Sequence, residues 1–272
     1  MPSPDIITIA QLVRLAGTAE APVIVDVRTE EDFAKDPRSL PGAVRRDFRT
    51  VASWVGDFAG RTVAVGCQRG LKLRQGVAAW LRHAGTPAEA VESGFEGWVA
   101  FGGLLVKPDH VPPRDERGRT LWVTRARPKI DRIACPWLIR RFVDPDAVFL
   151  FVAPSEVEAV AERFGATPFD IEGVFWSHQG ELCTFDVMIE QFGLRSEPLL
   201  RLAAIVRAAD TARLDLAPEA AGLLAVSLGL SRMYRDDLAQ LDAAMGLYDA
   251  LYRWARDATG ETHNWPAPGA KV

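Results

Sequence analysis

Residues 62–74 have the sequence TVAVGCQRGLKLR and predict a strand, a tight loop and a helix. The run TVAV is largely apolar and β-branched, as in a strand that is covered on both faces. Cys67 therefore stands on the loop between the strand and the helix. Backbone amides and the positive end of a helix dipole favour an anion at such a loop, so they favour thiolate over thiol. The stretch predicts an α/β domain with a reactive cysteine.

A second buried strand is predicted at residues 23–28, where VIVDVR is nearly continuous in apolar residues. The helix after Cys67 is predicted over residues 71–84, ended by Gly85. Strands that alternate with helices form parallel sheets, whose ligands bind beyond the carboxyl ends of the strands. Residues 1–108 are therefore expected to form a parallel sheet flanked by helices, with Cys67 at the ligand-binding edge.

The composition of the 272 residues is that of a globular protein, with 48% hydrophobic and 25% charged residues. No apolar run approaches about 20 residues, the length of a membrane-spanning helix, and the N-terminus lacks a signal-peptide pattern. Three widely spaced cysteines argue against a disulfide framework. The net charge of −4 argues against general nucleic-acid binding. We therefore expect a cytoplasmic protein without membrane or nucleic-acid partners.

Residues 109–119 are polar, contain adjacent prolines and are predicted to link the first domain to a second one over residues 120–272. The second domain is expected to be a mostly helical α/β domain. Apolar runs predict strands at residues 120–124 and 148–152, and helical spacing predicts helices at 133–142, 155–165 and most of 197–258.

Individual residues give three further details of these helices. Pro136 is expected in the first turn of the 133–142 helix, because proline lacks the amide that later positions need. Ser155 and Glu158 have the spacing of a capping box at the start of the next helix. In the long helical region, breaks are expected near Pro218 and Gly229.

A thiolate at Cys67 predicts sulfur chemistry, because it can take a sulfur atom from an anionic donor and pass it to another nucleophile. The residues expected to bind the donor are those of the loop and of the end of the 23–28 strand: Arg69, Gly70, Lys72, Arg74, Asp26 and Arg28. Two alternatives stay open. The first is that Cys67 is an inert buried cysteine. The second is that Asp26 and Arg28 form an ion pair that only holds the strand to the turn.

Residues 5–108 resemble a single rhodanese domain in motifs that occur in the family's order. The motifs are VDVR at 25–28, LPGA at 40–43, CQRGLK at 67–72 and GFEGW at 94–98. The resemblance implies a sulfurtransferase without a cofactor, in which a Cys67 persulfide carries sulfur from a thiosulfate-type donor to a thiol or cyanide. Lys72 stands where the family often has arginine, so the charge is kept but the bidentate fork is lost.

Metal-binding residue types fall close together in the second domain. Four lie within nine residues of one another: His178, Glu181, Cys183 and Asp186. Asp131, Cys135 or Asp210 would complete a shell if the fold brings it near. The set predicts a divalent metal site. The alternatives are an ordinary turn histidine at position 178 and a core cysteine at position 135.

Basic residues crowd into segment 114–141, which holds nine basic and three acidic residues. Their position before a helix N-terminus predicts a site for a small oxyanion, and a solvated basic face is the alternative. The candidates are Arg125, Lys129 and Arg132.

Residues 120–258 resemble the C-terminal domain of ChrB-type chromate-resistance proteins. The resemblance is carried by RPKIDRIACPWLIRRF at 127–142, by His178 with CTFD at 183–186, and by ADT at 209–211. It implies sensing or handling of chromate, and transcriptional regulation in family members that have a different N-terminal region.

Both resemblances together predict a cytoplasmic sulfurtransferase linked to chromate resistance. The expected partners are a small anionic sulfur donor, a thiol acceptor and chromate. The alternatives are a non-enzymatic sensor of chromate or another oxyanion, and a metal-dependent enzyme centred on His178.

Overall fold

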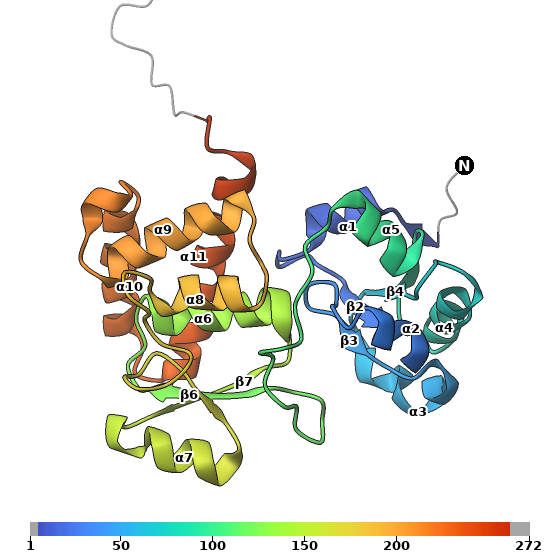
Figure 1. Cartoon of the computed structure of the whole chain (residues 1–272), viewed down its shortest axis with the longest axis horizontal. Coiled ribbons are helices and arrows are strands. Elements are labelled where there is room, and N and C mark those ends of the chain that lie inside the picture. The colour runs from blue at the N-terminus through green and yellow to red at the C-terminus, as the bar shows by residue number, and fades with distance from the viewer. Residues whose placement is uncertain (1–4, 262–272) are drawn as a thin grey trace, which may run out of the picture.

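The computed structural model describes residues 5–261, which form two lobes joined by one connecting segment (Figure 1). The first lobe contains the chain up to α5, and the second contains it from β6 to α11. Within residues 5–261, no helix is both long and apolar enough to cross a membrane. Most of the N-terminal stretch that lacks a signal-peptide pattern lies outside the described residues.

The first lobe is a five-stranded parallel sheet with the strand order β1-β5-β4-β2-β3. Helices alternate with the strands along the chain, which confirms the predicted α/β fold. The elements are β1 (Ile6–Ile7), α1 (Ile9–Leu15), β2 (Val23–Asp26), α2 (Glu30–Lys35), β3 (Val44–Arg45), α3 (Val51–Trp54), β4 (Val63–Gly66), α4 (Lys72–His83), β5 (Ala88–Val91) and α5 (Gly94–Phe101).

Both faces of this sheet are buried. Val25 and Val65 pack on one face with residues of α3 and α4. Ile24 and Ala64 pack on the opposite face with residues of α1 and α5. Because alternate side chains of a strand point to opposite faces, both sets must be apolar. The continuous apolar runs that predicted β2 and β4 are thus explained, and both strands are confirmed.

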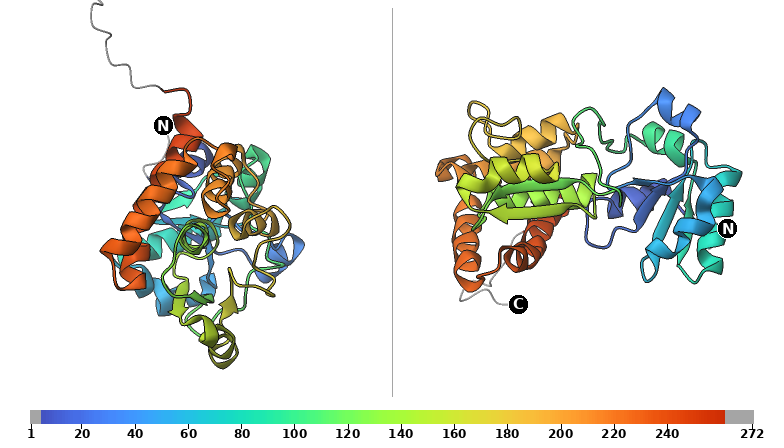
Figure 2. Two further views of the ribbon diagram at one scale, coloured as in Figure 1. Left: turned by 90° about the vertical axis from the view of Figure 1, so that its left-hand side faces the viewer. Right: turned by 90° about the horizontal axis from the view of Figure 1, so that it is seen from below.

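The second lobe has a three-stranded parallel sheet with the order β7-β6-β8. Most of its helices cover one face of the sheet, whereas α7 crosses the other face (Figures 1 and 2). The elements are β6 (Leu121–Arg125), α6 (Asp131–Leu138), β7 (Val148–Val152), α7 (Val157–Phe164), β8 (Thr167–Pro168), α8 (Thr184–Gln191), α9 (Glu197–Asp210), α10 (Ala220–Met233) and α11 (Asp237–Asp257).

Three expectations about the helices of this lobe are wrong in detail. Pro136 lies inside α6 rather than in its first turn, because the helix already begins at Asp131. After α6 the chain widens into a π-helical turn, Ile139–Val143. The Ser155 hydroxyl bonds Glu156 instead of capping α7. The helical region does break near Pro218, between the end of α9 and the start of α10, but Gly229 lies within α10, which ends at Met233.

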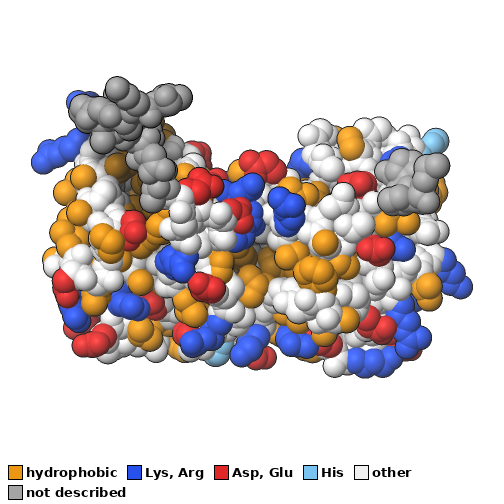
Figure 3. Space-filling view, turned by 90° about the horizontal axis from the view of Figure 1, so that it is seen from above, with side chains coloured by type: hydrophobic (Ala, Val, Ile, Leu, Met, Phe, Trp, Pro, Cys, Tyr) orange, Lys and Arg blue, Asp and Glu red, His pale blue; other side chains and the backbone are white. Residues whose placement is uncertain are grey.

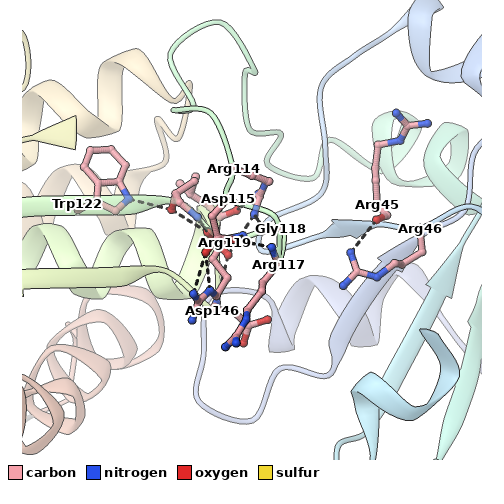
Figure 4. A network of polar contacts seen from close by, with 12 residues as sticks. Arg45, Arg46, Arg114, Asp115, Arg117, Gly118, Arg119, Trp122 and Asp146 are labelled. Carbon is pink, nitrogen blue, oxygen red and sulfur yellow. Dashed lines mark hydrogen bonds and ion pairs between the residues drawn. The ribbon is translucent and has the colours of Figure 1, made fainter. Parts of the chain in front are cut away.

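The connecting segment 109–119 has no helix or strand, as expected of a linker, but its second half is folded into a turn (Figure 4). The Asp115 carboxylate accepts hydrogen bonds from the amides of Arg117 and Arg119, at 2.9 and 2.8 Å. It also pairs with the Arg119 guanidinium at 2.8 Å, which lowers the pKa of Asp115. The turn therefore fixes where the chain enters β6.

Close backbone packing joins the two lobes. The Gly42 amide donates a hydrogen bond to the Phe142 carbonyl at 2.6 Å, and a Cβ on Gly17 would lie 2.2 Å from the Phe142 ring. The Arg256 guanidinium donates to the Arg14 carbonyl at 3.0 Å. In the space-filling view the lobes meet below a notch, and basic and acidic side chains are intermixed on this face (Figure 3).

Candidate functional site

Cys67 is the first residue after β4, and its loop ends where α4 begins at Lys72. The Cys67 side chain is almost buried, and its sulfur lies 4.0 Å from the Leu71 carbonyl oxygen, so the loop curls around it. The start of α5 holds this loop from the other side. The Phe95 amide donates to the Cys67 carbonyl at 2.9 Å, and the Glu96 amide donates to the Gln68 carbonyl at 3.0 Å.

Two glycines allow this close approach. Gly70 has a φ of +68°, and a Cβ there would lie 2.7 Å from the backbone of Ser93. Gly94 has a φ of +59°, and a Cβ there would lie 2.1 Å from the Cys67 carbonyl oxygen. Only glycine fits either position without displacing backbone. The glycines of the CQRGLK and GFEGW motifs therefore serve one contact between the two loops.

Three cationic side chains, Arg69 in the loop and Lys72 and Arg74 in the first turn of α4, differ in their surroundings. Arg74 is buried, and its Nε and Nη1 have no hydrogen-bond partner within residues 5–261. Burial lowers the pKa of the Arg74 guanidinium, while the charges of Cys67 and Glu92 oppose this shift. Arg69 is exposed and contacts Glu96 at 3.3 Å, and Lys72 is exposed. Of the three, Arg74 is the one whose side chain is buried.

Asp26 and Arg28 form a buried ion pair with a shortest distance of 2.7 Å. Arg28 Nε donates to Asp26 Oδ2 at 2.8 Å, and its Nη1 and Nη2 donate to the carbonyls of Asp36 and Arg38, both at 2.8 Å. The guanidinium also lies 3.9 Å from the centre of the Phe95 ring. These contacts hold the end of β2 to a neighbouring turn and to α5. A substrate-binding role for the pair stays a prediction.

In the second lobe, His178 meets carboxylates from three other parts of the chain. Its Nε2 lies 3.5 Å from Asp131 Oδ2, 3.5 Å from Asp170 Oδ1 and 3.2 Å from Asp210 Oδ2. Asp131 is the first residue of α6 and Asp210 the last residue of α9, while Asp170 follows β8. We call these four residues the His178 cluster.

The carboxylates of the cluster differ in their hydrogen bonding. Asp131 is completely buried, and its Oδ2 accepts from the Thr184 amide at 2.7 Å. Its Oδ1 has no hydrogen-bond partner in the part of the chain that the structure describes. Asp170 Oδ1 accepts from the Thr184 hydroxyl at 3.0 Å, and its Oδ2 lies 3.2 Å from Arg132 Nε.

Crowded carboxylates perturb the titration of the cluster. Hydrogen bonds to Asp131 and Asp170 raise the pKa of His178 to about 10. Burial, reinforced by the charges of Asp131 and Asp170, raises the pKa of Asp210 to about 7. Burial also raises the pKa of Asp131. The fold thus brings three carboxylates together, and the single imidazole of His178 balances their negative charge only in part.

The remaining predicted metal ligands belong to other contacts. Asp186 Oδ1 accepts from Arg207 at 2.6 Å, and Asp186 Oδ2 accepts from the Cys183 thiol at 3.2 Å. Glu181 is exposed and lies 3.7 Å from Arg213. Of the four residues grouped by spacing, the structure places only His178 in the cluster, where it meets Asp131 and Asp210, two of the three residues that could complete the shell. Cys135 is buried in the hydrophobic core.

The sequence did not single out two acidic residues of the His178 cluster. Asp210 was one of three ways to complete the shell, and Asp170 was not predicted. Asp170 follows the short strand β8 after one intervening residue, Phe169, and has a φ of +51°. Strand ends are where ligand-binding residues gather in parallel sheets, but β8 has two residues and leaves little trace in the sequence.

The three predicted oxyanion residues do not share one site. Arg125 and Arg132 both approach Asp170, at 3.7 and 3.2 Å. Lys129 instead lines a separate hollow beside α10, together with Arg127. Arg125 also lines an open hollow of about 540 Å³ that reaches His178.

Comparison with known proteins agrees with this two-part architecture. Residues 8–101 match the rhodanese-like domain, which defines the class of the first lobe. Residues 122–255 match the C-terminal domain of ChrB. The two matches fall on the two lobes of the structure, one on each.

Among characterised proteins, the chain is similar to the protein ChrB of Cupriavidus metallidurans. The two are 36% identical over 147 residues, which cover 53% of this chain and 44% of that protein. The chain therefore matches less than half of this relative's length.

Among solved structures, the first lobe is similar to two staphylococcal proteins. A protein of Staphylococcus saprophyticus is 27% identical, with a TM-score of 0.31, over 35% of this chain and 92% of that chain. A rhodanese-like domain protein of Staphylococcus aureus is 26% identical, with a TM-score of 0.32, over 35% of this chain and 90% of that chain.

Proposed function

We propose that the first lobe is a sulfurtransferase in which Cys67 carries sulfur as a persulfide. The observation that supports this most directly is a buried arginine, Arg74, in the first turn of the helix that follows the Cys67 loop. The loop presents one thiol at the carboxyl end of β4, where parallel sheets bind ligands. Arg74 supplies a fixed positive charge and two donor groups without a partner among the described residues. A thiolate and an anionic donor both gain from such a charge.

The proposed reaction has two displacements. The Cys67 thiolate attacks the outer sulfur of thiosulfate, the sulfur–sulfur bond of the donor breaks, and sulfite leaves with the bonding electrons. A thiol or cyanide then attacks the outer sulfur of the Cys67 persulfide. The Cys67 thiolate leaves and is ready for the next donor. No external oxidant or reductant is required, because each step exchanges one sulfur bond for another.

The exposed cations have a weaker role in this proposal. Lys72 is a single point charge on a flexible stem, so it attracts an anionic donor without fixing its orientation. Arg69 shares its charge with Glu96. Arg74 is therefore proposed to be the main electrostatic partner of the sulfur. The reaction also needs a reduced thiol, which fits a cytoplasmic location and the three free cysteines.

We further propose that this transfer serves chromate resistance. The support is the ChrB C-terminal domain in the same chain and the similarity to the protein ChrB. The structure packs the two lobes directly against each other through Phe142 and Gly17. A persulfide formed in the first lobe would then act in the context of chromate handling by the second.

The test is transfer of sulfur from thiosulfate to cyanide by the full chain and by Cys67→Ser. The matched control is Cys183→Ser, whose hydroxyl retains a donor for Asp186. We expect thiocyanate formation by the parent and the control but not by Cys67→Ser. Mass spectrometry of the thiosulfate-treated parent should show one added sulfur atom on Cys67. If the parent transfers no sulfur, or Cys67→Ser transfers it at the parental rate, the enzymatic proposal is wrong. The first of these results would favour a binding module.

A further inference from the structure

We propose that Asp131, Asp170 and His178 bind one divalent transition-metal ion in the second lobe, with Asp210 beside His178. This site is separate from Cys67, and its ligand set differs from the one that spacing in the sequence predicts. It combines His178 with Asp131, which the sequence offered as one option, and with Asp170, which was not predicted. It omits Glu181, Cys183 and Asp186, which have other contacts.

The spacing of Asp131, Asp170 and His178 matches that of ligands around one ion. A metal–ligand distance of about 2.1 Å puts neighbouring ligand atoms about 3.0 Å apart in an octahedral shell and about 3.4 Å apart in a tetrahedral one. His178 Nε2 lies 3.2–3.5 Å from an oxygen of each of the three carboxylates. One ligand atom each of Asp131, Asp170 and His178 lies within 4.8 Å of the others.

A second observation concerns Asp131 alone. Its side chain is completely buried, yet its Oδ1 has no hydrogen-bond partner within residues 5–261. Burying an unpaired carboxylate oxygen is costly unless another group compensates it. A cation held by this carboxylate and its neighbours would compensate it. Structural contacts already explain the other buried acids nearby, such as Asp186 with Arg207.

Charge at the site also favours a cation. Three carboxylates surround one imidazole, and the adjacent arginines contact only one of them. Arg132 and Arg125 both approach Asp170, on the oxygen that does not face His178. They therefore leave Asp131 and Asp210 without a direct guanidinium partner at the cluster among the described residues. A divalent ion would be attracted by the excess negative charge.

The supporting contacts resemble those that orient metal ligands. The Thr184 amide donates to Asp131, and the Thr184 hydroxyl donates to Asp170. Such outer hydrogen bonds fix the orientation of ligand carboxylates. Asp131 and Asp210 stand at helix ends, so their backbones are held by packing. Asp170 and His178 lie in the irregular segment between β8 and α8, so the site joins that segment to the ends of two helices.

The donor atoms restrict the identity of the ion. One imidazole nitrogen with carboxylate oxygens suits Mn²⁺, Fe²⁺ or Zn²⁺, whereas the soft ion Cu⁺ prefers thiolates. His178 is 40% exposed and lines the same open hollow as Arg125. The hollow offers the ion an entry path. Arg125 at its wall would favour an anionic ligand on the open side of the ion.

The test uses the full, untagged chain after treatment with a chelator. Mn²⁺ is added alone, and binding is followed by the electron paramagnetic resonance signal of the free ion. Zn²⁺ is tested separately by calorimetry. We expect one ion per chain. His178→Gln should weaken binding by roughly 100-fold or more, because removing even a supporting residue costs about 10–100-fold.

Matched controls separate this site from incidental binding. His83→Gln removes an exposed histidine of the first lobe, and Glu172→Gln removes an exposed acid beside the same hollow. Both should bind as the parent does. Asp131→Asn is a second test, and circular dichroism verifies that this variant is folded. If it does not fold, the proposal is judged on His178→Gln alone. The proposal is overturned if the parent binds neither ion, or if His178→Gln binds as tightly as the two controls.

Discussion

A Cβ atom on Gly94 would lie 2.1 Å from the carbonyl oxygen of Cys67. The same glycine has a φ of +59°, a region that other residues occupy only with strain. We therefore expect Gly94→Ala to lower the free energy of unfolding by at least about 2 kcal/mol. Since the contact shapes the Cys67 loop, sulfur transfer should fall as well. Urea unfolding and the thiosulfate assay measure the two effects.

Gly76→Ala is the control for this substitution. Gly76 is exposed within α4, and a Cβ there would have no atom within 4 Å. Alanine in the middle of a helix is more stable than glycine by about 0.5–1 kcal/mol. Gly76→Ala should therefore raise the free energy of unfolding. Equal behaviour of the two alanine variants would contradict the close contact between Gly94 and Cys67.

A second prediction concerns the buried pair of Asp26 and Arg28. Arg28→Met leaves the Asp26 carboxylate without its partner and frees two carbonyls, so it should cost about 3–5 kcal/mol of stability. Arg38→Met breaks a partly exposed pair with Asp36 and should cost at most about 1 kcal/mol. Thermal unfolding compares the variants. If Arg28→Met is as stable as Arg38→Met but has a raised KM for thiosulfate, Arg28 binds substrate instead.

Much of the first lobe could be predicted because its local pattern and its packing agree. The apolar runs of β2 and β4 reflect helices on both faces, and the loop at Cys67 follows from the chain's turn into α4. The second lobe was harder. Pro136 is tolerated inside α6, and Gly229 is tolerated inside α10, because tertiary packing outweighs local preference.

The candidate metal site was also predicted only in part from the sequence. Spacing in the sequence groups His178 with Glu181 and Asp186, but α8 directs Asp186 toward Arg207. The fold instead supplies Asp170 and Asp210 from the end of β8 and the end of α9. Asp170 lies as near to His178 in the sequence as Asp186 does, but it was missed because the strand before it, β8, is too short to predict. Asp131 and Asp210 meet His178 only after α6 and α9 pack.

A third prediction concerns the reactivity of the three cysteines. Burial and nearby carboxylates raise the pKa of the Cys135 and Cys183 thiols, so both should stay protonated at pH 7–9. Iodoacetamide should therefore label Cys67 first in the folded protein. Cys135 and Cys183 should react only after unfolding in guanidinium. Peptide mass spectrometry gives the order, and rapid labelling of Cys183 in the folded protein would contradict it.

The last prediction concerns Arg74, whose guanidinium is buried beside the Cys67 loop. Arg74→Met keeps an unbranched side chain of similar length but removes the charge. We expect sulfur transfer to fall by about 10²-fold, the usual effect of losing one group that stabilises a reacting anion. The free energy of unfolding should stay within about 1 kcal/mol of the parent, because a buried charge with unpaired donors contributes little stability.

Two further variants make the Arg74 result specific to charge at this position. Arg74→Lys keeps a positive charge and should recover most of the rate that Arg74→Met loses. Lys35→Met removes an exposed charge from α2 and should leave the rate unchanged. Steady-state kinetics with thiosulfate and cyanide compare all three variants with the parent. If folded Arg74→Met transfers sulfur at the parental rate, the loop amides alone stabilise the anion, because Arg69 and Lys72 are too exposed to hold it firmly.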